Sequence, residues 1–458
     1  MVIKWSGYDT YIGPYKYNLP YNNDIIGIEY HHYSKLMFGI VVRLRPGVPS
    51  TLNAFCTTDY AKNSSPRYWG FPNYEVNQLK ASYYGQTRDA GRQLEQKHSN
   101  YSAGYFNYFF GGSRHSLQYG TQKHYKKTYN SVDGFNIVSS HHLIVDNRCN
   151  RLYALDSGTL HYSATEIYTV QLPAILVFDL PLNGCQTRNF PVIRRVEIPG
   201  YLFNNPVGYN FLSLDQQPKG TCDDVYVYAS NAFDNRVLVY DYKKNSFWNV
   251  EHTLMKPFIA ESYMLFREDY NYQLPLGVVN IALGWPDKNG DRPAFFTPGS
   301  SQAQYVFSSK YLKNPKSFSY KHGFKDYITL LGYRGCGSQA YREVFDESTG
   351  VMFFAEMQSN KLTCWNTALP ISPDTVGVVF ESEALQFISG LLIDPTGYLW
   401  FHSSQVPIDY LTQIPLDITD VNSRTFRIKV PDAISGTVCD TSSYYGRNLH
   451  SIDSEEQL

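Results

Sequence analysis

The chain has 458 residues, a net charge of −1 and 43% hydrophobic residues, enough apolar sequence for a large folded core. The near-zero charge, without long runs of Lys or Arg, argues against nucleic acid as a partner, and no window approaches the roughly 18 consecutive apolar residues of a transmembrane helix. Aromatic residues make up 16% of the chain, 40 of them tyrosines, which favours β structure because aromatic rings fit a pleated, half-buried surface.

The N-terminal stretch "MVIKWSGYDTYIG" lacks the apolar segment of a signal peptide. Two sequons in loop-like sequence, Asn63 and Asn100, nevertheless predict glycosylation sites, as in a secreted protein. The cysteines are scattered, without the CxxC pairs typical of zinc sites, and therefore indicate either buried thiols or long-range disulfides. There are seven of them, so at least one is unpaired within the chain: Cys56, Cys149, Cys185, Cys222, Cys336, Cys364 and Cys439.

A turn followed by an apolar, aromatic-rich strand recurs along the chain. The copies are "HHYSKLMFGIV" (31–41), "DNRCNRLYALDSG" (146–158), "DQQPKGTCDDVYVYAS" (215–230), "DKNGDRPAFFTPGS" (287–300), "DESTGVMFFAEM" (346–357) and "DPTGYLWFHSS" (394–404). An apolar stretch precedes most copies, and another short strand follows each one. The pattern predicts a strand, a turn, a second strand, a loop and a third strand, six times over.

The spacing of these units predicts the architecture. The second strands centre near Phe38, Tyr153, Tyr226, Phe295, Phe353 and Trp400, at intervals of 115, 73, 69, 58 and 47 residues. The first interval is too long for one unit, and the excess falls in the Tyr/Gly/Ser-rich residues 80–130, which we interpret as a long surface insertion. Irregular repeats of several strands are typical of β-propellers. We therefore predict an all-β, six-bladed propeller with a central tunnel, a single domain over residues 1–458 with a short C-terminal tail.

Several segments also resemble a known family. "GVPSTLNAF" (47–55), "RLYALDSG" (151–158), "VLVYDYKKNSFWNVEH" (237–252), "GSQAYREVFDESTGVMFF" (337–354) and "LQFISGLLID" (385–394) are similar to the insect yellow and major royal jelly proteins. The resemblance implies a six-bladed propeller, secretion and a small-ligand site at one end of the tunnel. "VIKWSGYD" resembles the segment that follows the family's signal peptide, so the chain is interpreted as a mature sequence with an added Met1.

The resemblance also implies a cysteine pairing. Two disulfides are expected, Cys149–Cys222 and Cys364–Cys439. Cys56, Cys185 and Cys336 are left without an assigned partner.

The first strand of each blade should face the tunnel and offer polar side chains to a ligand. Counting five residues back from the acidic residue of the turn gives His141, Asn210, Tyr341 and Ser389. In the fourth blade, where the turn is longer, Asn280 is the choice. Such a ring supplies hydrogen-bond donors and acceptors without strong charge. The alternative is that water satisfies these groups.

Amine-binding members of the family imply a more specific site. They hold the ammonium with a hydroxyl on the last blade's first strand, which matches Ser389, and with an Asn that matches Ser404. A backbone carbonyl also contributes, and Val406 matches its position. Many yellow proteins carry an acidic residue where this chain has Gly390. Because an ammonium leaving water needs several well-placed oxygens, we expect reduced amine affinity.

Other constellations are weaker. Two pairs of adjacent histidines, His31–His32 and His141–His142, point to opposite faces of their strands, and His402 stands apart, so we expect no metal site. No GxSxG, HExxH or P-loop motif occurs, and we expect no cofactor.

Two carboxylates, Asp156 and Glu356, end second strands in equivalent positions. Such a pair can serve acid–base chemistry, or the two carboxylates can simply bind turns.

Three functions stay open. The chain is a secreted protein that binds a small aromatic or amine ligand such as a catecholamine or indoleamine. Alternatively it is a dopachrome-converting, tautomerase-type enzyme of melanin formation, with His141 or Tyr341 as the base. The last possibility is a cuticular protein with an idle tunnel. The expected partner is a small molecule, with neither nucleic acid nor membrane involved, and the oligomeric state is open.

Overall fold

The computed structural model describes residues 2–5, 22–45, 47–61, 65–79, 135–161, 167–187, 189–266, 270–317, 327–405 and 416–440. Both sequons, Asn63 and Asn100, and the predicted insertion at 80–130 lie outside these residues. The chain divides into two compact units. Unit 1 consists of residues 1–209 and 402–426, and unit 2 of residues 210–401 and 427–458.

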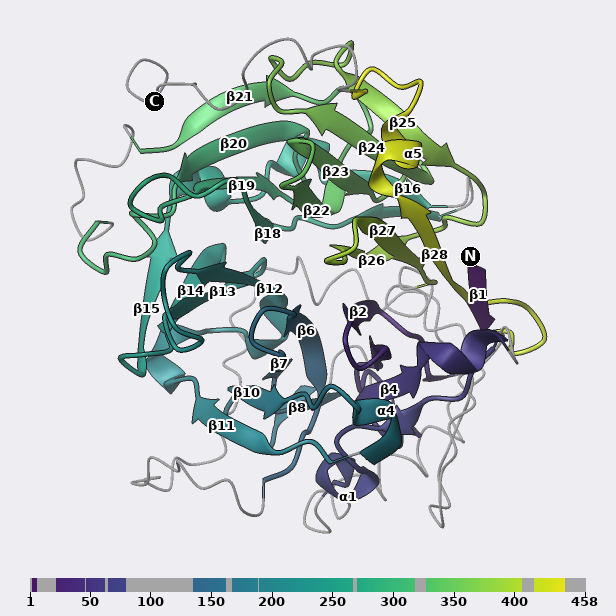
Figure 1. Ribbon diagram of the computed structural model, residues 1–458. Coiled ribbons are helices and arrows are strands. Elements are labelled where there is room, and N and C mark those ends of the chain that lie inside the picture. The colour runs from purple at the N-terminus through teal and green to yellow at the C-terminus, as the bar shows by residue number, and fades with distance from the viewer. Residues whose placement is uncertain are drawn as a thin grey trace. The chain divides into compact units, whose positions relative to one another are not determined.

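Six four-stranded sheets make up the fold, which is the predicted six-bladed β-propeller (Figure 1). The first two sheets are β2 (Gly27–His31), β3 (Leu36–Ile40), β4 (Leu52–Cys56), β5 (Trp69–Gly70), and β6 (Ser140–Asp146), β7 (Arg151–Asp156), β10 (Ala174–Asp179), β11 (Val192–Glu197). The third and fourth are β12 (Tyr209–Gln216), β13 (Val225–Asn231), β14 (Arg236–Asp241), β15 (Ser246–Glu251), and β18 (Val278–Leu283), β19 (Pro293–Pro298), β20 (Ala303–Ser308), β21 (Thr329–Tyr333). The fifth and sixth are β22 (Ala340–Asp346), β23 (Val351–Glu356), β24 (Lys361–Asn366), β25 (Val376–Glu381), and β26 (Ile388–Ile393), β27 (Tyr398–Ser403), β28 (Ser423–Lys429), β1 (Val2–Trp5).

Smaller elements connect the sheets. Two hairpins are formed by β8 (Thr159–His161) with β9 (Ile167–Thr169) and by β16 (Tyr263–Phe266) with β17 (Tyr270–Gln273). The short helices include α1 (Tyr74–Asn77), α4 (Gly184–Thr187) and α5 (Val430–Ile434), together with 3-10 turns such as η4 (Pro206–Gly208) and η6 (Ile259–Glu261). Within the described residues, no helix has the length and apolar character needed to cross a membrane.

The second strand of every sheet lies where the sequence predicts it. Each of the six predicted centres falls inside β3, β7, β13, β19, β23 or β27. These strands are almost wholly buried, whereas the fourth strands β15, β21 and β25 are largely half-buried or exposed. Burial on both faces explains why the second strands are continuous apolar runs and do not alternate.

In the copies that begin at Asp146, Asp346 and Asp394, the turn before the second strand combines an acidic side chain that accepts backbone hydrogen bonds with a left-handed residue. In the last copy, Asp394 accepts hydrogen bonds from the backbone N–H groups of Thr396 and Tyr398 and from Trp400 Nε1. Gly397, immediately before β27, has a φ of 75°. The same position has a positive φ at Lys35, Asn150 and Gly350, each immediately before a second strand. The recurring phrase is therefore a structural hairpin signal.

The disulfides confirm part of the predicted pairing and add to it. Cys364 is bonded to Cys439, as expected, with an S–S distance of 2.05 Å. Cys149 and Cys222 are both disulfide-bonded, as the second predicted pair requires. The residues left unassigned need a correction, because Cys56 and Cys185 form a bond across 129 residues of sequence. Cys336 is free and exposed, so the odd cysteine of the chain is identified.

Candidate functional site

The first strands of three sheets carry a β-bulge near their start. Ser140 pairs with Asp156 but His142 pairs with Leu155, so His141 is the extra residue of β6. Tyr341 is the extra residue of β22 in the same way, between Ala340 and Arg342. The count back from the acidic residue therefore placed His141 and Tyr341 in equivalent positions. Bulges re-aim side chains and are common beside functional sites.

The fourth sheet corrects one assignment. Its register shifts between Val278 and Asn280, which makes Val279 the bulged residue of β18. Asn280 therefore lies one position further along than His141 and Tyr341. The longer turn of this blade concealed the offset in the sequence.

In unit 2 an aromatic cluster gathers around Tyr341. Its ring lies 4.9 Å from the rings of both Phe211 and Phe387, measured between centroids. Val279 belongs to the same cluster of apolar side chains. Burial raises the pKa of the Tyr341 hydroxyl to about 12, so the phenol is neutral at physiological pH. Phe211 also carries the guanidinium of Arg342 over its face, 5.1 Å from the ring centroid.

The other predicted ligand-binding residues of unit 2 differ in how their side chains are used. Asn280 is buried and donates its amide to the Glu343 carbonyl oxygen at 2.9 Å, which links β18 to β22. Ser389 is buried on β26. Asn210, on β12, is half-buried and has no side-chain hydrogen bond to the described part of the chain. The first strands β18, β22 and β26 are neighbours in this unit.

In unit 1 the predicted residue with the most distinctive environment is His141. Its ring hydrogen-bonds to the Val207 backbone, and Nε2 has no partner among the described residues. Burial lowers the pKa of His141 to about 4, so its imidazole is neutral at physiological pH. Ser404 is buried in the same unit, and Val406 lies outside the described residues.

Two other histidines, His31 and His402, form hydrogen bonds within the fold. His31 bonds Ser34 at 2.7 Å and Asn150 at 3.0 Å through its two ring nitrogens. His402 bonds Thr425 and the Ile25 carbonyl oxygen. In the described ranges no three or more His, Cys, Asp or Glu side chains gather in a way that would hold a metal ion.

The two strand-ending carboxylates bind loops, as one reading of the sequence predicted. Asp156 accepts hydrogen bonds from the backbone N–H groups of Val138 and Ser139. Glu356 accepts from the hydroxyls of Ser359 and Thr363.

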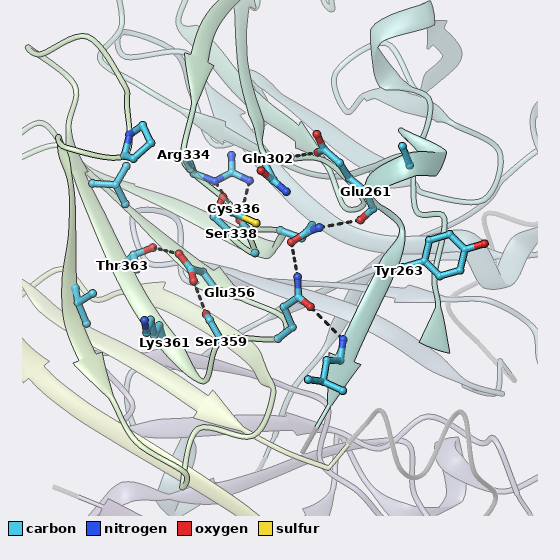
Figure 2. A pocket seen from close by; sticks show the side chains of 18 residues that line it. Glu261, Tyr263, Gln302, Arg334, Cys336, Ser338, Glu356, Ser359, Lys361 and Thr363 are labelled. Atoms are coloured by element: carbon cyan, nitrogen blue, oxygen red, sulfur yellow. Dashed lines mark hydrogen bonds between the residues drawn. The ribbon is translucent and has the colours of Figure 1, made fainter. Parts of the chain in front are cut away.

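A pocket of about 590 Å³ lies in unit 2, and Glu356 is the one sequence-predicted candidate residue that lines it (Figure 2). Its walls come from the segment before and along β16, the loop between β21 and β22, and the β23–β24 and β25 strands. A chain of amides connects the first two walls. Gln358 donates to Gln339 at 2.7 Å and accepts from the Leu265 backbone, while Gln339 donates to the Glu261 carbonyl oxygen.

Arg334 forms the buried base of this pocket. Its guanidinium donates to the carbonyl oxygens of Ser301 and Ser338, and to Gln304 Oε1 at 2.9 Å. Gln304 in turn donates to Glu343 Oε2 at 3.0 Å. Burial raises the pKa of Glu343 to about 7, although the nearby guanidinium opposes this shift. The base is therefore a hydrogen-bonded relay from a cation to a carboxylate that titrates near neutrality.

Comparisons with known proteins agree with the resemblance seen in the sequence. Residues 138–439 match the family model described as Major royal jelly protein. The chain is 32% identical to the yellow-related salivary protein M35 of Phlebotomus duboscqi over 306 residues, which are 66% of this chain and 73% of the relative. It is 28% identical to the L-dopachrome tautomerase yellow-f of Drosophila melanogaster over 424 residues, 92% of this chain and 83% of the relative.

Proposed function

The chain belongs to the yellow and major royal jelly protein family, and we propose that it is a secreted protein that binds a small aromatic ligand at the first strands of unit 2. Secretion is supported by the disulfides, which persist in oxidising compartments. It is also supported by the relatives that are named salivary proteins.

The observation that carries the proposal is the aromatic cluster of Phe211, Tyr341 and Phe387. Aromatic rings contribute large apolar area and specific stacking geometry, so such a cluster suits a catechol or indole ring. The Tyr341 hydroxyl has no hydrogen-bond partner in the described part of the chain and stays protonated, so it can donate to a ligand oxygen.

Charge around this cluster favours some substituents over others. Ser389 supplies a hydroxyl but no negative charge for an ammonium group. The Arg342 guanidinium over Phe211 repels a cation and attracts a carboxylate. We therefore infer reduced affinity for simple amines and preference for aromatic ligands that carry an acidic group.

A second function, dopachrome conversion, is favoured by His141. Its Nε2 is buried, neutral and without a partner among the described residues, as a general base requires. In an isomerisation of this kind Nε2 would take a proton from carbon while the iminoquinone takes the electron pair, and the proton would then return to the product. The similarity to the Drosophila L-dopachrome tautomerase supports this candidate.

Calorimetric titration with serotonin, dopamine and L-dopa, beside a spectroscopic dopachrome assay, tests both functions. We expect L-dopa to bind at least as tightly as dopamine, and Ser389→Ala to weaken dopamine further by up to about tenfold. Failure of all three compounds to bind would contradict the binding function. Rapid dopachrome turnover that His141→Ala abolishes would make the second function the correct one.

A further inference from the structure

The charged side chains that line the pocket above Arg334 balance one another. They are two carboxylates, Glu261 and Glu356, and two cations, Arg334 and Lys361. Arg334 already donates to the acceptors described above, and Lys361 lies 3.5 Å from Glu381. A charged ligand would leave water for a pocket that has no opposite charge in excess, so a neutral ligand is the better match.

Side-chain amides supply this pocket with hydrogen-bond donors. Gln358 donates one amide hydrogen to Gln339, and Gln339 donates one to the Glu261 carbonyl oxygen. Each amide nitrogen carries a second hydrogen, which has no acceptor among the described residues. The half-buried side chain of Gln302 also lines the pocket and has no hydrogen-bond partner in the described part of the chain. These three amides can therefore donate to a ligand without breaking an existing bond.

Carboxylate oxygens supply acceptors around the same space. Glu261 uses Oε2 to accept from the Gln302 backbone at 2.7 Å, and its other oxygen has no partner in the described ranges. Glu356 accepts from the hydroxyls of Ser359 and Thr363, and an ionised carboxylate offers about four lone-pair sites in all. Figure 2 shows Glu261 and Glu356 on different sides of the pocket. The pocket therefore offers both donors and acceptors, as a ligand with many hydroxyl groups requires.

One wall adds an exposed aromatic ring. In β16, Met264 is buried, whereas its neighbours Tyr263 and Leu265 are 67% and 39% exposed and line the pocket, as the alternation of a strand predicts. A solvent-exposed phenol ring can stack on the apolar C–H face of a pyranose ring. Balanced charge, many hydrogen-bonding groups and an aromatic face together match the chemistry of a sugar.

We propose that the pocket above Arg334 binds a neutral carbohydrate. Its volume of about 590 Å³ lies within the roughly 300–1,000 Å³ of small-molecule pockets and leaves room for a mono- or disaccharide. A metal ion is a poorer match, because the described residues offer no group of three or more suitable ligands. The proposal goes beyond the proposed function and uses no side chain of the aromatic cluster around Tyr341.

Saturation-transfer NMR tests binding with the neutral disaccharides maltose, cellobiose, lactose and N,N′-diacetylchitobiose. At least one of them should bind with a Kd of about 1 mM or tighter. Sorbitol, which carries hydroxyl groups but no ring face, should bind at least about tenfold more weakly. Saturating L-dopa should not displace the disaccharide, because the two sites are separate. Absence of binding by all four disaccharides, equal binding of sorbitol, or displacement by L-dopa would overturn the proposal.

Cys336 reports where the disaccharide binds. It lines the pocket, is exposed, and is the free thiol of the chain. A saturating amount of the tightest-binding disaccharide should slow its alkylation by iodoacetamide at least about threefold, because few unoccupied molecules remain. Sorbitol at the same concentration should leave the rate unchanged. Binding without protection of Cys336 would place the sugar elsewhere and contradict the proposal.

Two variants test the side chains of the site. Tyr263→Ala removes the exposed ring and should raise the disaccharide Kd about tenfold, whereas Tyr201→Ala, at an 81% exposed tyrosine outside the pocket, should not change it. Gln302→Ala removes an amide without a partner in the described residues and should raise the Kd about five- to tenfold. Neither side chain is fully buried, so both variants should keep the fold. An unchanged Kd for either Tyr263→Ala or Gln302→Ala would show that a sugar does not bind as proposed.

Discussion

Each unit contains a buried arginine that ties loops together, but the two arginines have different surroundings. Arg43 of unit 1 donates to five backbone carbonyl oxygens, those of Val48, Pro49, Asn77, Ile137 and Val138. Arg334 of unit 2 also bonds carbonyl oxygens, but it donates to the Gln304 amide as well and lies near three carboxylates. A buried arginine can therefore either hold loops together or balance the charge of nearby carboxylates.

The buried titratable groups of the two units change stability with pH in opposite directions. In unit 1, burial lowers the pKa of His141 and His402 to about 4 each. The folded state then binds fewer protons than the unfolded chain between about pH 4 and 6.5, so these groups lower stability as the pH falls through that window. In unit 2, burial raises the pKa of Glu343 from 4.5 to about 7. That group lowers stability as the pH rises from about 4.5 to 7.

Replacing each arginine by methionine should have the largest effect on stability. We expect both Arg43→Met and Arg334→Met to lower the free energy of unfolding by about 3–5 kcal/mol, because each strands buried acceptors. The loss for Arg334→Met should grow between pH 5 and 8, since burial raises the pKa of Glu343 to about 7 and this carboxylate would then ionise without the nearby guanidinium. Urea unfolding at several pH values measures both effects.

A half-buried arginine with an exposed ion-pair partner provides the control for this pair. Arg236 pairs with Glu251, which is 58% exposed, and Arg236→Met should cost less than about 1 kcal/mol. Equal pH dependence of Arg43→Met and Arg334→Met would show that the carboxylates do not distinguish the two sites.

Neutralising Glu343 should remove the pH dependence of stability that this residue causes in unit 2. Glu343→Gln keeps an oxygen for Gln304 and should raise the free energy of unfolding at pH 8 by up to about 3 kcal/mol, with little change at pH 5. Glu347→Gln, at a 57% exposed side chain, is the matched control and should change little at either pH. A Glu343→Gln variant that is less stable than the parent at pH 8 would show that the ionised Glu343 stabilises the fold, the opposite of what the raised pKa predicts.

Much of the fold was predictable because it depends on local chemistry. The aromatic second strands and their acidic turns recur in the sequence. An acidic residue followed by an aromatic strand, such as Asp394 and Trp400, therefore identifies a blade. The equivalence of His141 and Tyr341 followed from a fixed distance to the turn. In the fourth blade the longer turn offers no such distance, and the chosen Asn280 lies one position past the bulged residue Val279.

The rest depends on distant segments that meet only after folding. Scattered cysteines do not reveal their partners, so the bond between Cys56 and Cys185 was missed. The pocket above Arg334 combines side chains from Ala260 to Val378, with no motif in any one segment. A glutamate with a pKa near 7, such as Glu343, is likewise a product of packing.

Titration of L-dopa into two tyrosine variants tests whether the first strands of unit 2 hold an aromatic ligand. Tyr341→Ala removes the ring that contacts Phe211 and Phe387, and should raise the Kd about tenfold. Tyr333→Ala, at a 53% exposed tyrosine of β21, should leave the Kd unchanged. An unchanged Kd for Tyr341→Ala would show that the ligand does not bind at this aromatic cluster.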